Sequence, residues 1–484
     1  MPSRTEVLLA CAITCAIHTG CAQIIGIENL PPLEEPPPVE IDAGPQPVQR
    51  TIAVADKVDI LFVIDDTFRM TPAQRRLADG LPSLFDSLPG QSGLPDLHVG
   101  VISTDLAAHP TVLNCGADDN DNGALQSSFT DDPNFPQCSD DSLAIDGAFI
   151  RDAPDPASAR VTNYTGDLTD VLSCMVVLGE NGCGFEQPLA AMRRAFENPI
   201  NAGFLRSDAM LAVVFFSEED DCSAFDPAMY DPTMNSKDGP LGPFDSFRCF
   251  EFGVECDPDA PRVLGDKLAC KPREDSSYIY DVNQYVDFLR GLKPDPQQIV
   301  VAGLVGVDLG APDAPLEVIT ELKPLGEVFS LVPACEVMGT DINDEPVVVS
   351  SAAPAVRLRA VLDAFPGRSA LGSVCDEDPT GALGSVGGLI ARSLEQRWCL
   401  PADVDRMSDV PGVQDACEVR EQSYDGDTLV DTTALARCTS NTLPCWQFVF
   451  PSDRCTIEAP VELVIQRPGP APANAMIEVR CNLD

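Results

Sequence analysis

The sequence is poor in histidine and in positive charge, and both shortages narrow the range of functions. Only three histidines, His18, His98 and His109, occur in 484 residues, and HExxH, GxSxG and Walker-type phosphate-loop motifs are absent. Metalloprotease, α/β-hydrolase and nucleoside-triphosphatase functions therefore lose their usual sequence support, although catalysis is not excluded. Lys and Arg number 31 against 76 Asp and Glu, a net charge of -45, so nucleic acid and bare anionic membranes would be repelled.

The acidic excess would attract divalent cations and basic partners, although it also serves solubility alone. A hydrophobic content of 44% is ample for burial and argues against global disorder. The length exceeds that of one ordinary core and predicts two or three domains.

Hydrophobic runs of membrane-spanning length are also lacking. Arg4 precedes a short apolar segment, VLLACAITCAI (7–17), which indicates an export signal over residues 1–20. The following HTGC (18–21) resembles the lipobox of bacterial lipoproteins and predicts lipidation of Cys21, although His18 departs from that pattern. Residues 8–11 match the pattern better but leave almost no apolar region. The alternative is an ordinary cleaved signal.

The cysteine count supports export. Removing Cys11, Cys15 and Cys21 from the 19 cysteines leaves 16, an even number typical of a disulfide-bonded exported chain. The 16 fall into even groups along the sequence, and pairing within each group is a hypothesis. The groups are Cys115 and Cys138; Cys174 and Cys183; Cys222, Cys249, Cys256 and Cys270; Cys335 and Cys375; and Cys399, Cys417, Cys438, Cys445, Cys455 and Cys481.

Composition divides the mature chain into three parts. Residues 21–50 contain LPPLEEPPP and GPQP and predict a stiff proline-rich tether. Residues 51–398 predict one α/β domain interrupted by two long, disulfide-stapled insertions, 106–160 and 219–280. Residues 399–484 carry six cysteines and short strand-like runs at 446–450, 460–465 and 476–479, which predict a small β-rich module.

Apolar strands alternate with helical patterns in the central part. This predicts a mostly parallel sheet covered on both faces. Gly80 and Pro82 are expected to break or kink the first helix, and the glycine-rich stretch 381–388 is expected to begin a closely packed helix. The expected strands are 58–64, 97–103, 210–216 and 299–305, and the expected helices 73–88, 185–197, 281–292, 354–365 and 381–396.

The stretch VDILFVIDDTFRM (58–70) resembles the opening of von Willebrand factor type A (VWA) domains, whose first strand ends in D-x-S-x-S. NGCGFEQ (181–187), FLRSDAMLAVVFFSEEDDCS (204–223) and GLKPDP (291–296) extend the similarity to exported bacterial lipoproteins with such a domain, over residues 55–400. The resemblance implies a Rossmann-like fold and an adhesion site in which loop oxygens hold Mg²⁺ or Mn²⁺ and a partner carboxylate completes the coordination.

Residue by residue, the resemblance implies a defective site. In the family, the first loop supplies one Asp and two hydroxyls, a second loop a Thr and a third loop an Asp. Asp65 matches the first-loop Asp, Thr67 keeps the first hydroxyl, and Glu218 lies near the position of the third-loop Asp. Arg69 stands where a second Ser is expected and offers no acceptor, and no residue matches the family's Thr. Either Arg69 pairs with Asp65 or Glu218 and replaces the cation, or Asp65, Thr67, Glu218 and waters hold a metal while Arg69 points to solvent.

A second acidic stretch, DDNDNG (118–123), partly matches a calcium loop. Asp118, Asn120 and Asn122 occupy ligand positions, but Phe129 stands where the bidentate Glu is required. The segment therefore predicts either a weak Ca²⁺ site or an Asx-rich turn. The run EEDD (218–221) similarly predicts an acidic rim or a solvated loop, with only Glu218 positioned by the preceding strand.

Together these patterns predict an exported lipoprotein of the cell envelope, in the outer membrane with a periplasmic or surface location. Its expected function is adhesion or protein–protein binding without catalysis, with contact to the membrane through the lipid anchor only. The cofactor would be Mg²⁺, Mn²⁺, Ca²⁺ or none. The alternatives are a metal-dependent hydrolase that uses the acidic crevice, and a structural envelope protein with a vestigial site.

Overall fold

The computed structural model describes residues 48–53, 56–89, 93–116, 120–129, 136–139, 142–155, 160–323, 326–340, 345–401, 404, 417–425, 428–438, 442–468, 472 and 474–481. The predicted signal peptide, Cys21 and nearly all of the tether lie outside these residues. Residues 47–484 form one compact unit.

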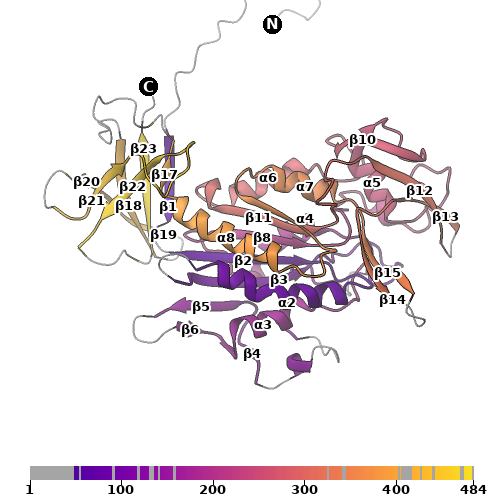
Figure 1. The fold of residues 1–484 in the computed structure, drawn as a ribbon, viewed down its shortest axis with the longest axis horizontal. Coiled ribbons are helices and arrows are strands. Elements are labelled where there is room, and N and C mark those ends of the chain that lie inside the picture. Colours follow the sequence, from indigo (N-terminus) through magenta and orange to yellow (C-terminus); the bar gives the residue numbers. More distant parts are fainter. Residues whose placement is uncertain are drawn as a thin grey trace, which may run out of the picture. The chain divides into compact units, whose positions relative to one another are not determined.

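A seven-stranded mixed sheet forms the centre of this α/β unit (Figure 1). In the order given below, the first five strands pair in parallel. The sixth strand pairs antiparallel with the fifth, and the seventh pairs antiparallel with the sixth. All four predicted strands are present. The fifth parallel strand was missed because its sequence, SALGS, lacks an apolar run. The order is β16 (Ser369–Ser373), β11 (Ile299–Val305), β8 (Met210–Phe216), β2 (Lys57–Ile64), β3 (Asp96–Ser103), β5 (Ile150–Pro154) and β6 (Arg160–Thr162).

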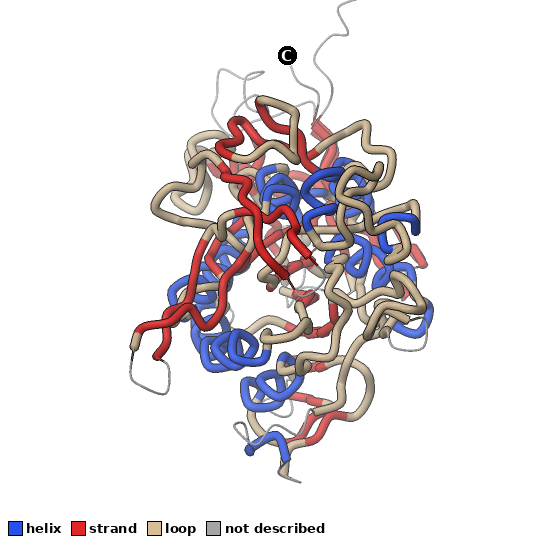
Figure 2. Tube along the Cα trace, turned by 90° about the vertical axis from the view of Figure 1, so that its right-hand side faces the viewer, coloured by secondary structure: helices blue, strands red, loops and turns tan. Residues whose placement is uncertain are grey.

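Helices cover both faces of this sheet (Figures 1 and 2). Alternate residues of β2 point to opposite faces, so Ile60 and Phe62 belong to one apolar core and Leu61 and Val63 to the other. These two cores explain why the strands are apolar throughout. The first core contains α2 (Thr71–Ser87), α3 (Leu168–Val176) and α8 (Thr380–Gln396); the second contains α4 (Pro188–Glu197), α6 (Val282–Gly291) and α7 (Val356–Asp363).

Helix α2 continues through Pro82 as one helix, which contradicts the break but not the kink that was expected as its alternative. Proline removes the hydrogen bond to the carbonyl four residues earlier, which is that of Ala78. The Ser173 hydroxyl on α3 donates to the Ala78 carbonyl at 3.2 Å and so replaces the lost bond.

Helices α2 and α8 approach closely at glycines, as the glycine-rich stretch predicted. A Cβ added at Gly387 would lie 2.1 Å from the Leu84 carbonyl oxygen. Gly387→Ala should therefore lower the free energy of unfolding by about 1–3 kcal/mol through overpacking. Gly381→Ala is the matched control, because a Cβ there meets nothing within 4 Å. Denaturant titration measures both, and equal midpoints would contradict this packing.

The second insertion and residues 316–352 form a separate layer of strands. Four strands pair in the order β13 (Gly326–Leu331), β12 (Leu316–Lys323), β10 (Gly265–Pro272) and β9 (Val254–Asp257), next to α5 (Phe247–Gly253). Strands β14 (Cys335–Thr340) and β15 (Pro346–Ala352) form an antiparallel hairpin. Smaller elements are β4 (Ala144–Ile145), β7 (Tyr164–Thr165) and the 3₁₀ helices η1 (Pro136–Ser139), η2 (Pro199–Asn201), η3 (Pro227–Tyr230) and η4 (Pro296–Gln298).

The C-terminal residues form the predicted β-rich module, but they recruit a strand from the other end of the chain. Strand β1 (Val48–Ala53) pairs with β23 (Ala475–Cys481), so Val48 to Arg50, expected at the end of the tether, belong to a strand. One sheet has the order β1, β23, β18 (Cys417–Asp425) and β19 (Thr428–Ala434); the other has β17 (Cys399–Leu400), β22 (Val461–Gln466), β21 (Cys445–Val449) and β20 (Ala436–Arg437).

Eight disulfides join the sixteen predicted cysteines, and two of them correct the predicted grouping. Cys115 pairs with Cys183 and Cys138 with Cys174, so the first insertion is stapled to the segment before α4 and to α3 instead of to itself. This number of disulfides is typical of an exported protein. None of the helices in the described ranges is long and apolar enough to cross a membrane. The other pairs stay within their groups: 222–249, 256–270, 335–375, 399–455, 417–481 and 438–445.

Candidate functional site

The candidate site lies at the carboxyl ends of β2, β3 and β8. The chain leaves β2 towards β3 on one side and leaves β8 towards β11 on the other, so β2 and β8 flank a topological switch point. Ligands of open α/β sheets bind at such points because the diverging loops leave space between them. The switch point brings Asp65, at the end of β2, beside Ser217 and Glu218 at the end of β8.

The Asp65 carboxylate holds these two loops together. It is fully buried, and its Oδ1 accepts hydrogen bonds from the Thr67 amide at 2.9 Å and the Thr67 hydroxyl at 2.5 Å. Its Oδ2 accepts from the Ser217 hydroxyl at 2.9 Å and the Glu218 amide at 3.2 Å. Burial raises the pKa of Asp65, although these four donors oppose the shift. The network therefore satisfies both oxygens of the predicted first metal ligand from within the protein.

Arg69 forms no ion pair with these carboxylates, although its positive charge opposes the rise in the pKa of Glu218. Among the described residues, no ion pair joins Arg69 to Asp65 or Glu218, and the side chain is exposed. Its backbone has φ of 81°, a left-handed conformation unusual for arginine, and its amide donates to Glu180 Oε2 at 3.2 Å. The guanidinium lies 5.3 Å from the centre of the Phe68 ring. The Arg69 side chain therefore faces solvent, which removes the ion pair of the first alternative without testing the metal of the second.

This placement predicts the outcome of a cation titration. Arg69→Ser should leave the binding isotherms for Mg²⁺, Mn²⁺ and Ca²⁺ unchanged, because the exposed guanidinium blocks no ligand oxygen. Calorimetric titration of both proteins measures this, with Asp65→Ala as the variant that disrupts the loop junction. Cation binding gained only in Arg69→Ser would contradict the placement.

Two buried residues that the sequence interpretation missed complete the site. Thr104 follows β3, and its hydroxyl donates a hydrogen bond to Glu186 Oε2, just before α4. Glu186 Oε1 and Asp66 Oδ1 are buried without a hydrogen-bond partner. Burial and repulsion by neighbouring carboxylates raise the pKa values of Glu186 and Asp66 well above their usual range. NGCGFEQ includes Glu186, but no spacing in the sequence connects it with Thr104.

The oxygen atoms of the site are of the kind that bind a hard cation, but their arrangement is not that of a metal site. Carboxylate and hydroxyl oxygens are the ligands that Mg²⁺ and Ca²⁺ prefer. However, within the part of the chain that the structure describes, no three His, Cys, Asp or Glu side chains converge on a point where they could hold a metal ion. Asp65, Thr67 and Glu218 are brought together as hydrogen-bonded neighbours and do not form a preformed coordination shell.

The candidate calcium loop is only partly described, because Asp118 lies outside the described residues. Asn122 N donates to Asn120 Oδ1 at 2.9 Å, the geometry of an Asx turn. The Asn122 carbonyl accepts from Asn198 Nδ2 at 3.1 Å, which ties the turn to the end of α4. These bonds account for the two asparagines as turn residues.

The EEDD run separates into two acids that hold other loops and helices, Asp220 and Asp221, and two that line a cavity, Glu218 and Glu219. The Asp220 carboxylate accepts hydrogen bonds from the Arg357 amide at 2.8 Å and the Leu358 amide at 3.1 Å. It therefore caps the N-terminus of helix α7. Asp221 accepts from the Leu189 amide at 3.1 Å and forms a fully buried ion pair with Arg357 at 3.0 Å. The expectation of a solvated loop is therefore wrong for Asp220 and Asp221, which are held by α7 and α4 and not by the preceding strand.

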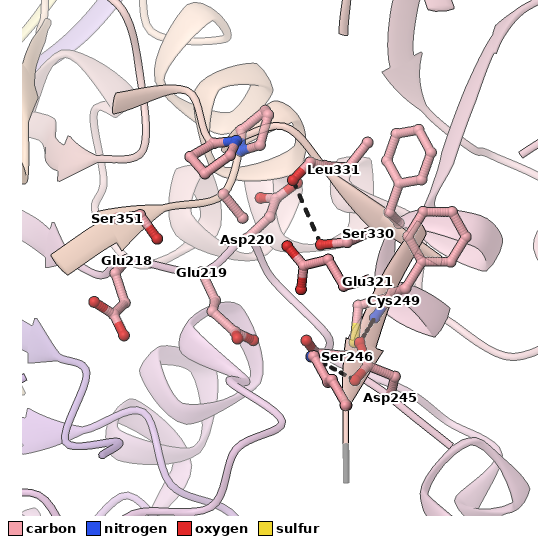
Figure 3. A pocket seen from close by; sticks show the side chains of 16 residues that line it. Glu218, Glu219, Asp220, Asp245, Ser246, Cys249, Glu321, Ser330, Leu331 and Ser351 are labelled. Atoms are coloured by element: carbon pink, nitrogen blue, oxygen red, sulfur yellow. Dashed lines mark hydrogen bonds and ion pairs between the residues drawn. The ribbon is translucent and has the colours of Figure 1, made fainter. Parts of the chain in front are cut away.

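Glu218 and Glu219 face a cavity of about 270 Å³ beside the switch point (Figure 3). Burial, followed by repulsion from Asp65, raises the pKa of each to about 8. The one lysine of the lining, Lys323, pairs with Asp245 at 2.7 Å. Further lining comes from α5, β12, β13, the end of β15 and the loops next to them, including Phe247, Glu321, Ser330 and Ser351.

Comparison with known proteins was made against families, curated proteins and solved structures. No family model and no curated protein matches. Among solved structures, the chain is similar to the pilus adhesin RrgA from Streptococcus pneumoniae, with 9% identity and a TM-score of 0.28 over 89% of this chain and 57% of that one. The chain thus spans just over half the length of that adhesin. No family is shown. A TM-score this low carries no argument, so the function is inferred from the site itself.

Proposed function

We propose that this chain is an exported binding protein that contacts a protein partner at the carboxyl edge of its central sheet. In this proposal the central unit is a VWA-like domain with a degenerate metal site, and a lipidated Cys21 and the tether hold it at the outer membrane. Three features support the VWA-like interpretation: the mostly parallel sheet, the helices on both of its faces, and the loops at the switch point.

The cavity lined by Glu218 and Glu219 carries this proposal. At neutral pH, two carboxyls with pKa values of about 8 are mostly protonated in the free protein. A lysine or arginine side chain entering the cavity would ionise them and gain a charge-assisted hydrogen bond that water does not provide. The cavity therefore suits a basic group of a partner. A metal that holds a partner carboxylate, as the family resemblance implies, would first have to displace the proton of Glu218.

Binding is favoured over catalysis because Glu218 and Glu219, the groups of the cavity whose pKa values suit proton transfer, have neither a histidine nor a preformed metal shell beside them among the described residues. Neither mature histidine lines the cavity: His98 Nδ1 contacts the Phe204 carbonyl, and His109 contacts Thr111. A metal-dependent hydrolase would need a coordination shell that the described residues do not preform. A purely structural role would leave the buried, unpartnered oxygens of Asp66 and Glu186 without a purpose.

Site-specific cross-linking in the producing cells tests this function. A photo-reactive amino acid placed at Glu321, which is exposed and lines the cavity, should capture an envelope protein. The same amino acid at Arg392, exposed on α8 and outside the cavity lining, is the control. Capture from Glu321 and not from Arg392 supports the proposal. No adduct, or the same adduct from both positions, overturns it.

A further inference from the structure

We propose that the outer edge of β15 receives an extended segment of the partner as an added strand, with a lysine or arginine of that segment reaching Glu218 and Glu219. This inference rests on the proposed function and specifies how the partner is held. It goes beyond the cavity because it assigns a main-chain contact to the β14–β15 hairpin.

The direction of the backbone groups identifies the open edge. The Ala352 carbonyl accepts from Ala334 N at 2.8 Å on the β14 side, whereas Ala353 N donates to the Glu218 carbonyl at 2.8 Å on the other side. Backbone groups alternate in direction along a strand, so Ser351 shares the outer side with Ala353. The outer edge of β15 thus runs directly into the loop that carries Glu218, and Ser351 lines the cavity (Figure 3).

The β14–β15 hairpin is a two-stranded sheet with a free edge. Strands β14 and β15 pair with each other and with no other strand in the described ranges (Figure 1). Such isolated hairpins are marginally stable, and free edges recruit strands from other chains. Val348 and Val349 on β15 are 47% and 46% exposed, which offers apolar positions on the strand that has the open edge.

Charge decides which occupant fits this edge. The tether of the same chain carries acids at Glu28, Glu34, Glu35, Glu40 and Asp42 and no base up to residue 47, so it offers no basic group to Glu218 and Glu219. A second copy is disfavoured because two chains of net charge -45 repel each other. The complementary occupant is an extended segment of a different protein that combines β-branched residues with a basic side chain.

A random peptide library displayed on phage and selected on the full mature chain tests the inference. Enriched peptides should carry Lys or Arg within an alternating β-branched pattern, and their binding should fall at least tenfold in Glu219→Gln. Ser351→Pro removes an amide on the outer edge of β15 and should abolish binding. Glu336→Pro is the matched control, because Glu336 faces Ser351 across the hairpin and its amide points away from β15.

The outcomes separate this inference from the proposed function. Loss in Ser351→Pro with retention in Glu336→Pro supports strand addition at β15. Peptides lost in Glu219→Gln but bound by both proline variants overturn strand addition while the acidic binding site stands. No enrichment of basic peptides, or binding indifferent to Glu219→Gln, overturns both. Formation of the Cys335–Cys375 disulfide, checked by mass spectrometry, confirms that each variant has folded at the hairpin.

Discussion

Replacing Asp221 by alanine should lower the free energy of unfolding by about 3–5 kcal/mol, because it leaves a buried guanidinium without its counter-ion. Asp221 and Arg357 are fully buried, and Arg357 Nη2 also donates to the Tyr280 carbonyl at 2.7 Å. The same carboxylate accepts from the Leu189 amide at the start of α4, so its loss also exposes a helix terminus. Denaturant titration with the disulfides intact measures the change.

The control is an ion pair of similar length at the surface. Arg193 and Glu197 lie 3.0 Å apart on α4 with side chains that are 42% and 47% exposed, so Glu197→Ala should cost about 0.5 kcal/mol or less. A loss of less than about 1 kcal/mol in Asp221→Ala would contradict the view that the Asp221–Arg357 pair anchors the loop after β8.

The stability of the protein should fall as pH rises from about 5 to 8, and Glu218 and Glu219 should account for much of that fall. Their pKa values rise from 4.5 in the unfolded chain to about 8 in the fold. Between these values the folded protein holds protons that the unfolded chain has released, so the free energy of unfolding decreases with pH. Calorimetric melting temperatures across this range measure the slope.

The double variant Glu218→Gln and Glu219→Gln isolates their contribution. It should show a flatter profile than the natural protein and a higher melting temperature at pH 8, because glutamine needs no proton to remain neutral. Asp65, Asp66 and Glu186 have raised pKa values and keep a residual slope of the same sign. An unchanged slope in the double variant would show that the two carboxyls ionise normally in the fold.

Local patterns predicted the elements that lie within one stretch of sequence. The apolar run before Asp65 predicted β2, and the glycines of 381–388 predicted a closely packed helix, because periodicity and steric size act locally. The same rules failed at Pro82, where the Ser173 hydroxyl from another helix replaces the lost backbone bond. That compensation depends on tertiary packing and leaves no signal near Pro82.

Long-range pairings were beyond sequence patterns for the same reason. Grouping cysteines by segment predicted the wrong partners for Cys115 and Cys174, because spatial proximity and not sequence distance decides which thiols meet. Some residues of the site were predicted to be neighbours, and others were missed. Asp65, Thr67 and the amide of Glu218 are neighbours in the fold, but their hydrogen bonds were not foreseen, and Thr104 and Glu186 come from segments 82 positions apart.

The most direct test of the account compares cross-linking from position 321 in three backgrounds. These are the natural chain, the Glu218→Gln and Glu219→Gln double variant, and a charge-matched control, Asp86→Asn with Glu395→Gln, whose two residues are exposed and do not line the cavity. We expect the same adduct in the natural chain and the control, and its loss in the double variant. An adduct that persists in the double variant, or disappears equally in both variants, would contradict recognition of a basic group by Glu218 and Glu219.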